Sequence, residues 1–397
     1  MARKKYKKPN FFVYYFFKFC CWFMSKIMYR CRVTKNDLKG KKGPFLLISN
    51  HESHTDFFNI YPAVPGRAHF VISYSFYKTS SIRRVMDKCG LIPKQQFQTT
   101  PKEMKQMKSA IKNNMPLIIC PVGLMSENGM STNPGITTSG LVKFLETDVY
   151  ICKVSGSYLT HPKWTNKRRR GRVNLEITKL YDKEQLDELS NEQIYSDICE
   201  RIKYNAYDYQ EKVLYKFKRG DNVEGLNYVI HQCPDCKAIK AIEANNNTLR
   251  CSHCGYEVKA DEYGLLNLVK GNNFYRKPSD WYLWMQDNIA EEIKNNPTFT
   301  YESHGAIHMI DEKTSKFTEV GSGTVTLNKE IITLKGIVNN EPIDVELITS
   351  NYILLPYKPG RHIELQQGMN IYRIVFDNPY DASLFNMYLK EFNNNKN

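Results

Sequence analysis

The sequence predicts an α/β protein whose mixed, partly parallel sheet is flanked by helices, followed by a small cysteine-rich module and a β-rich C-terminal region. Between residues 44 and 180, short apolar runs alternate with helical stretches, a pattern typical of parallel strands joined by helices. Two C-x2-C pairs lie between Cys233 and Cys254. From Gly305 onward, short alternating runs are separated by Gly, Asn, Asp or Pro, which favours a separate β domain.

Chain length limits the number of domains, and net charge indicates the kind of partner. A chain of 397 residues is long enough for two or three domains. Its net charge of +15 favours anionic partners, namely a lipid surface, phosphorylated substrates or nucleic acid. Seven of the 11 cysteines are scattered and four are regularly spaced, which favours a reduced compartment with one metal site over a disulfide framework.

The first thirty residues predict an interfacial membrane anchor. Residues 1–8 are basic, and Phe11–Met24 is aromatic and apolar apart from Lys18. Aromatic side chains beside cations are typical of the headgroup region. The run is shorter than the about 20 residues of a membrane span, and no small-residue cleavage site follows it. We expect a monotopic or peripheral protein on the cytoplasmic face of a bacterial cell membrane, with a tilted span and a signal peptide as alternatives.

Hydrophobic periodicity predicts the strands and helices between residues 44 and 215. The apolar run Pro44–Ser49 predicts a buried strand, and a helix is expected from Ser53 to Tyr61. Thr100-Pro101 is a typical helix start. Further strands are expected at residues 70–73, 116–120, 149–154 and 171–178, and further helices at 80–88, 137–146 and 190–215.

His51 and Asp56 form a candidate catalytic pair. Residues five apart on one helix point about 140° away from each other, so the two side chains meet only if His51 precedes the helix. A strand that ends at Ser49 and a helix that begins near Ser53 supply that arrangement. Asp56 would then fix the imidazole tautomer, and His51 would take a proton from a substrate hydroxyl. From spacing alone, a capping or core histidine is the competing interpretation.

The segment Asn50-His51 to Asp56 resembles the first motif of the glycerolipid acyltransferases, which include the bacterial PlsC-type lysophosphatidic acid acyltransferases. The likeness continues in order over roughly residues 30–215. Gly90–Pro93 resembles the second block, Pro121–Ser126 resembles the third block (P-E-G-T-R-S in the family), and Val149–Val154 stands where the fourth block lies. The resemblance implies transfer of a fatty acyl group from acyl-coenzyme A or acyl-carrier protein to the hydroxyl of a lysophosphatidic acid-like lysophospholipid in phospholipid biosynthesis. It implies His51 and Asp56 as catalytic residues and the following as substrate-binding residues: Asn50, Lys94, Gln96, Gly123 and Ser126.

The sequence departs from the family where the acceptor's phosphate is held. Gln96 stands where an Arg closes the second block, and Lys153 replaces the usual Pro of the fourth. In the third block, Val122, Leu124 and Met125 replace Glu, Thr and Arg. A phosphate dianion needs cationic or N–H donors. Either another cation (Lys94, Arg83, Arg84 or Lys153) takes over, or the acceptor is not lysophosphatidic acid.

The four regularly spaced cysteines predict a structural zinc site of the zinc-ribbon type. They form the pairs Cys233/Cys236 and Cys251/Cys254, separated by fourteen residues. Four thiolates complete a tetrahedral Zn²⁺ shell and leave no open position for catalysis. Unligated thiols are the competing interpretation.

The strand-rich tail with its final helix resembles the PH-like fold in element order, and Lys358, Arg361 and Arg373 are candidates for contact with anionic lipid or a protein. The basic run 167–170 beside Trp164 is compatible with a membrane contact, a solvated hairpin or a nucleic-acid patch.

The predicted domains are an anchor (residues 1–35), an acyltransferase domain (36–215), a zinc ribbon (216–262), a helical linker (263–300) and a PH-like domain (301–397). The expected partners are anionic membrane lipids, the acyl donor and a lysolipid acceptor, and we expect no nucleic acid. Two other hypotheses stay open: a catalytically inactive homologue that binds lipid or protein, and a nucleic-acid-binding zinc-ribbon protein.

Overall fold

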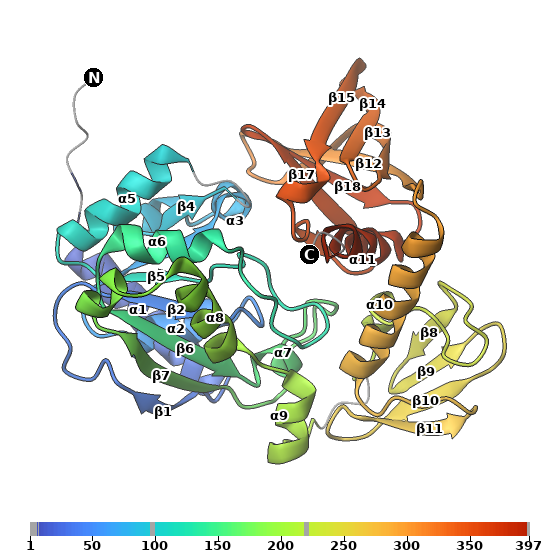
Figure 1. Ribbon diagram of the computed structural model, residues 1–397, viewed down its shortest axis with the longest axis horizontal. Helices are drawn as coiled ribbons and strands as arrows, with labels where there is room; N and C mark the ends of the chain where they lie inside the picture. The colour runs from blue at the N-terminus through green and yellow to red at the C-terminus, as the bar shows by residue number, and fades with distance from the viewer. Residues whose placement is uncertain (1–5, 7, 96–99, 218–221, 395–397) are drawn as a thin grey trace. The chain divides into compact units, whose positions relative to one another are not determined.

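A computed structural model describes residues 6, 8–95, 100–217 and 222–394 (Figure 1). The chain divides into two units. The first contains residues 1–162 and 168–215, and the second contains residues 163–167 and 216–397. The first unit is an α/β structure, and the second is built mainly from antiparallel strands.

A seven-stranded sheet forms the centre of the first unit, in the order β1-β7-β6-β2-β5-β3-β4. Its strands are β1 (Arg32–Asn36), β2 (Leu46–Ser49), β3 (His69–Ser73), β4 (Ile92–Lys94), β5 (Leu117–Ile119), β6 (Val149–Ser155) and β7 (Asn174–Tyr181). All neighbours pair in parallel except β6 and β7, which are antiparallel. The predicted mixed, partly parallel sheet is confirmed.

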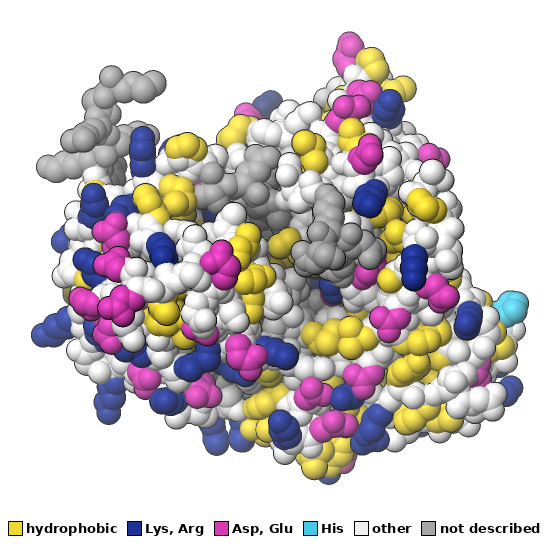
Figure 2. Space-filling view, in the orientation of Figure 1, with side chains coloured by type: hydrophobic (Ala, Val, Ile, Leu, Met, Phe, Trp, Pro, Cys, Tyr) yellow, Lys and Arg dark blue, Asp and Glu magenta, His cyan; other side chains and the backbone are white. Residues whose placement is uncertain are grey.

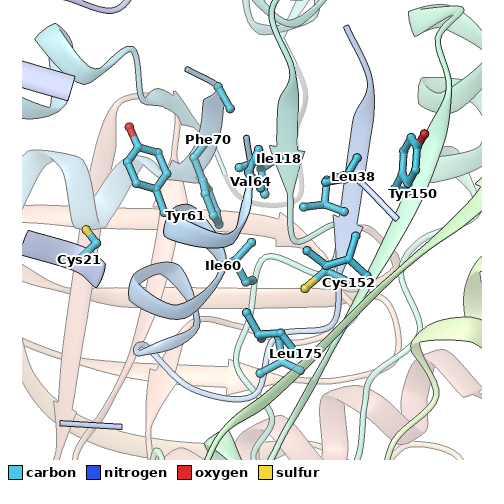
Figure 3. Packing of buried hydrophobic residues seen from close by; sticks show 14 of the residues in the cluster. Cys21, Leu38, Ile60, Tyr61, Val64, Phe70, Ile118, Tyr150, Cys152 and Leu175 are labelled. Carbon is cyan, nitrogen blue, oxygen red and sulfur yellow. The ribbon is translucent and has the colours of Figure 1, made fainter. Parts of the chain in front are cut away.

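Helices cover both faces of this sheet. They are α1 (Phe11–Ile27), α2 (Asp56–Ala63), α3 (Tyr74–Thr79), α4 (Arg83–Cys89), α5 (Pro101–Lys112), α6 (Thr137–Leu145), α7 (Ser157–Thr160), α8 (Asn191–Ile202) and α9 (Ala206–Val213). Successive residues of a strand point to opposite faces. Leu47 of β2 accordingly joins the core layer that contains α1, α2 and α4, whereas Leu46 and Ile48 join the layer that contains α5, α6 and α8. Figure 3 shows Ile60 of α2 meeting Cys152 of β6 and Leu175 of β7 in the first layer.

Two helical predictions differ from the structure. The helix expected at residues 190–215 is two helices, because the chain leaves the helical conformation at Lys203 and Asn205 begins a new helix by accepting hydrogen bonds from Tyr207 N and Asp208 N. The helix expected from Ser53 begins at Asp56. Residues 50–55 therefore form a loop between β2 and α2.

Helix α1 is embedded in the first unit along one side only. Tyr14 and Cys21 are buried in its core, while Phe12 and Phe16 on the outer side are 82% and 70% exposed. Lys18, the one charge in the aromatic run, donates hydrogen bonds from Nζ to the carbonyl oxygens of Val64 and Gly66, which follow α2. The ammonium group of Lys18 therefore satisfies carbonyl oxygens at the C-terminal end of α2. Within the described ranges, no helix is long and apolar enough to cross a membrane.

The second unit contains two antiparallel sheets. The smaller has the order β11-β10-β9-β8 and consists of β8 (Ile242–Asn245), β9 (Thr248–Cys251), β10 (Glu257–Ala260) and β11 (Leu266–Lys270). Helix α10 (Pro278–Asn295) leads to the larger sheet, with the order β15-β14-β13-β12-β18-β17-β16. Its strands are β12 (Tyr301–Ile310), β13 (Phe317–Leu327), β14 (Ile331–Val338), β15 (Glu341–Ile348), β16 (Tyr357–Lys358), β17 (His362–Gln367) and β18 (Asn370–Phe376), followed by helix α11 (Asp381–Asn394). The predicted change to a β-rich C-terminal region with a final helix is confirmed, and its strands are antiparallel.

Candidate active site and cysteine cluster

The candidate site lies at the carboxyl edge of the sheet in the first unit. Strand β2 ends at Ser49, and it lies between the parallel strands β5 and β6. The loop after β2 therefore opens where three parallel strands end, which is where open α/β sheets bind their ligands. His51 is in this loop, and Asp56 is the first residue of α2.

His51 and Asp56 contact each other as predicted from the strand–loop–helix arrangement. His51 Nδ1 lies 2.9 Å from Asp56 Oδ2. The same oxygen accepts hydrogen bonds from the backbone N–H groups of Glu52 at 2.7 Å and Ser53 at 2.9 Å. The Asp56 side chain is 1% exposed, whereas that of His51 is 23% exposed. The carboxylate is thus held from three sides, and the imidazole reaches the surface with its other nitrogen available for a substrate.

Asn50 and Glu52 flank the histidine, and both are buried. Asn50 Nδ2 donates to the carbonyl oxygen of Val154 at 2.9 Å, and its Oδ1 accepts from Val154 N at 2.8 Å. These bonds fix the loop to the end of β6. Asn50 Nδ2 also donates to Glu52 Oε1 at 3.0 Å, while Glu52 Oε2 has no partner among the described residues. Burial, with a further contribution from Asp56, raises the pKa of Glu52 well above its usual value.

The segment that resembles the third block lies against the histidine loop. Ser126 N donates to the carbonyl oxygen of His51 at 2.9 Å. The Ser126 hydroxyl is buried, donates to Met130 O and accepts from Gly129 N. Gly123 has φ of +70°, a conformation that favours glycine. The structure therefore brings this block beside His51, with Ser126 supporting the backbone of the loop.

Lys94 ends β4, at the same edge of the sheet. Its Nζ donates to the carbonyl oxygen of Gln95 at 3.0 Å, and burial lowers the pKa of its ammonium group. Gln96 lies outside the described residues. Among the predicted substrate-binding residues, Asn50 and Ser126 contact the histidine loop directly, whereas Lys94 belongs to an outer strand of the sheet.

The sequence does not indicate the polar residues that pack behind the histidine loop. A buried carboxyl group such as that of Glu52 has no sequence signal. Tyr204 falls in the break between α8 and α9, which the sequence did not predict. The Tyr204 hydroxyl accepts a hydrogen bond from Gly156 N at 2.8 Å. Burial, followed by the charge of Glu52, raises the pKa of Tyr204. Thr55 and Ser157 also meet here, with their hydroxyl oxygens 3.0 Å apart.

Comparison with known proteins relates part of the first unit to a family of enzymes. Residues 30–155 match the family model described as Acyltransferase, which covers less than half of the chain. This stretch contains His51 and Asp56, and acyl transfer is the activity of the family it matches. Among solved structures, the chain is similar to the crystal structure of the 1-acyl-sn-glycerophosphate (LPA) acyltransferase PlsC from Thermotoga maritima, with 17% identity, a TM-score of 0.41, and coverage of 48% of this chain and 75% of that one. A search of curated proteins found no significant match.

The four regularly spaced cysteines of the second unit form one cluster. The Sγ atoms of Cys233 and Cys254 are 3.6 Å apart and those of Cys236 and Cys251 are 3.7 Å apart. All four Sγ atoms lie within 4.8 Å of one another. A tetrahedron of sulfur atoms bound at about 2.3 Å to a metal has edges of roughly 3.8 Å, so the cluster has the dimensions of a four-thiolate metal site.

Backbone hydrogen bonds hold the loop that carries the first cysteine pair. Asp235 accepts hydrogen bonds from the backbone N–H groups of Asn272 and Asn273 at 3.0 and 2.8 Å. Lys237 N donates to the carbonyl oxygen of Cys233, and Lys237 itself has φ of +59°. These contacts tie the Cys233–Cys236 loop to the segment after β11, and they fix the direction of both thiols.

The basic run 167–170 does not form a uniformly solvated patch. Arg169 is buried, and Arg168 donates to the carbonyl oxygen of Met28 at 2.6 Å. Trp164 is only 4% exposed, so the expectation that it supports a membrane contact is wrong. On the face drawn in Figure 2, acidic side chains lie between the lysine and arginine side chains along the rim of the first unit.

Proposed function

We propose that the protein transfers a fatty acyl group from an acyl thioester, acyl-coenzyme A or acyl-carrier protein, to the hydroxyl group of a lysophospholipid in phospholipid biosynthesis. The observation that carries this proposal is the contact between His51 and the buried Asp56, at the carboxyl edge of an α/β sheet and inside the stretch that matches the acyltransferases. His51 is the general base in this proposal, and Asp56 positions it.

The proposed reaction needs no enzyme nucleophile. Asp56 accepts a hydrogen bond from His51 Nδ1–H, which leaves Nε2 as the base. Nε2 removes the proton of the acceptor hydroxyl while its oxygen attacks the thioester carbonyl carbon. The tetrahedral intermediate collapses by breaking the C–S bond, and the imidazolium returns its proton to the leaving thiolate. Asp56 stabilises the imidazolium through its negative charge.

The acceptor in this proposal is lysophosphatidic acid-like, although the third block offers no charged side chain for its phosphate. We propose Lys94 and Gln96 as residues that contact the acceptor, together with the loop residues Asn50, Gly123 and Ser126. Burial lowers the pKa of Lys94, and an anionic headgroup beside it would reverse that shift.

We propose that the outer side of α1 lies in the surface of a membrane, on its cytoplasmic face. The supporting observation is a row of exposed aromatic residues on a helix whose other side is buried in the first unit: Phe11, Phe12, Tyr15, Phe16, Phe19, Trp22 and Phe23. Full burial of a Phe side chain contributes about 1.5–3 kcal/mol, so partial burial of several residues is enough for peripheral binding.

For the second unit, we propose that Cys233, Cys236, Cys251 and Cys254 hold a structural Zn²⁺ in a zinc ribbon at residues 216–262. The segment predicted as a helical linker (263–300) contains strand β11 of the same sheet in addition to helix α10, and a PH-like domain (301–397) follows in this proposal. Zinc bound by four thiolates stabilises a small fold and supplies no reactive position. The role of the ion here is therefore to keep the two C-x2-C loops together.

The test of the proposed function is acyl transfer by purified wild-type protein and His51→Ala in anionic vesicles. Labelled acyl-coenzyme A and acyl-carrier protein are offered with lysolipids that carry or lack a phosphate headgroup. We expect transfer that falls by 10²–10⁴-fold in His51→Ala, the range for loss of a general base. No transfer to any acceptor by a folded protein that still binds vesicles would leave the alternative, a catalytically inactive homologue that binds lipid or protein.

A further inference from the structure

One edge of the larger sheet in the second unit carries basic side chains around a buried histidine. Lys358 of β16 lies directly opposite His362 of β17, and Arg373 of β18 lies opposite Glu364 of β17. Cross-strand partners project from the same face, with Cβ atoms about 4.5–5.5 Å apart. His362 and Glu364 are two residues apart on one strand, so they also share this face. Lys358, His362 and Arg373 are thus neighbours on one surface.

The His362 side chain is buried without satisfying its polar atoms. It is 8% exposed, and its Nδ1 has no hydrogen-bond partner among the described residues. Burial lowers the pKa of His362 to about 2, with further contributions from Arg373, Arg361, Lys358 and Lys163. A buried nitrogen that lacks a hydrogen-bond partner destabilises the folded state. The cations around it favour an anion as the missing partner.

Two of these cations are held in place by aromatic and polar contacts. The guanidinium of Arg373 lies 3.5 Å from the ring centroid of Phe317 and pairs with Glu364 through Nη2 at 2.5 Å. Lys358 donates a hydrogen bond from Nζ to Asn166 Oδ1. For the described residues, Glu364 is the one acidic side chain paired with Lys358, Arg361 or Arg373. Two positive charges therefore remain unbalanced beside the neutral imidazole.

We propose that Lys358, Arg361, His362 and Arg373, the basic cluster, bind a phosphate group. Phosphate is the matching chemistry because a dianion balances the two excess charges, and its oxygens accept several hydrogen bonds from Lys and Arg at once. The group belongs either to a lipid headgroup or to a soluble phosphorylated molecule. This site goes beyond the proposed acyl transfer, since the basic cluster is in the second unit and His51 is in the first.

Titration of the full-length protein with inorganic phosphate tests the site, with sodium chloride at matched ionic strength as the reference. Lys358→Gln and Arg361→Gln each remove one cation, and Arg361 is exposed, so its variant keeps the fold. Lys329→Gln is the matched control, because Lys329 is an exposed cation of the same sheet region. We expect phosphate affinity to fall about tenfold or more in the first two variants, the range for loss of a charged hydrogen bond. Lys329→Gln should stay within about twofold of wild type.

A second measurement identifies the source of the phosphate. Vesicles of phosphatidylcholine with and without phosphatidic acid are compared for wild type, Lys358→Gln and Lys329→Gln, all of which keep α1 intact. Tighter binding to phosphatidic acid that is lost only in Lys358→Gln indicates a lipid headgroup. Phosphate binding without that vesicle effect indicates a soluble ligand. The proposal is overturned if phosphate binds no better than chloride, or if Lys358→Gln and Arg361→Gln behave like Lys329→Gln. None of these outcomes depends on acyl transfer, so a failure here leaves the proposed function standing.

Discussion

The substitution Asp56→Asn separates the charge of Asp56 from the geometry of its contact with His51 in the proposed catalytic pair. Three donors converge on Asp56 Oδ2, namely His51 Nδ1, Glu52 N and Ser53 N, whereas Oδ1 has no partner among the described residues. An Asn side chain can place its oxygen where Oδ2 lies and its amide nitrogen where Oδ1 lies. All three hydrogen bonds then persist and the negative charge is removed, while the amide nitrogen occupies the position of Oδ1, which has no partner among the described residues.

The expected loss of activity in Asp56→Asn follows from the distance between Asp56 Oδ2 and His51 Nδ1. A unit charge 2.9 Å from His51 Nδ1 stabilises an imidazolium by about 6 kcal/mol at an effective dielectric constant of 20. The His51 side chain is 23% exposed, and water screens part of this energy. We therefore expect a loss of roughly 4 kcal/mol in the transition state, or about 10³-fold in kcat. Asp56→Ala is less informative, because it leaves two buried N–H groups unpaired at about 1–3 kcal/mol each.

The assay is acyl transfer to lysophosphatidic acid in vesicles by wild type, His51→Ala, Asp56→Asn and the double variant, with thermal unfolding as the control for folding. Because Asp56 acts through His51, the double variant should lose little more activity than His51→Ala alone. Activity within tenfold of wild type for Asp56→Asn would refute the electrostatic role. A double variant whose loss equals the product of the single losses would refute the coupling.

Three further predictions concern stability, membrane binding and metal. Because burial raises the pKa of Glu52 well above its unfolded value of 4.5, the free energy of unfolding should fall as the pH rises above 4.5. Glu52→Gln should weaken that pH dependence, measured by denaturant unfolding at pH 5 and pH 8, because each unit of pKa shift is worth about 1.4 kcal/mol. An unchanged dependence would contradict a raised pKa at Glu52. Replacement of both Phe12 and Phe16 by serine should reduce binding to anionic vesicles at least about tenfold, while the unfolding temperature changes little. Vesicle binding equal to that of wild type would exclude this side of α1 from the membrane surface. Elemental analysis should find about one zinc per chain, and Cys236→Ser or a chelator should remove it and lower the unfolding temperature; a zinc-free wild type of equal stability would contradict a structural ion.

The sequence was sufficient where local chemistry dictates the structure. A buried strand that ends at Ser49, before a helix, requires His51 to lie in a loop, and the C-x2-C spacing brings four thiols together. Long-range packing could not be predicted. Lys18, the one charge of the aromatic run, binds the carbonyl oxygens of Val64 and Gly66, more than forty residues away, and no local pattern indicates that contact. Trp164 lies beside cations in the sequence, as aromatic residues at a membrane interface do, but it is buried. Tertiary contacts decide which side of an aromatic residue is covered.

The pairing of β1 with β7 has a consequence for synthesis of the chain. Arg32 in β1 pairs with Asn174 in β7, so the strand that follows α1 receives its partner about 140 residues later. At roughly 5–20 residues per second, that interval lasts about 7–28 s. For most of it, the aromatic helix lies outside the ribosome while the strand behind it is still unpaired. The proposed contact between the outer side of α1 and a lipid surface can therefore form before the sheet beside His51 is complete.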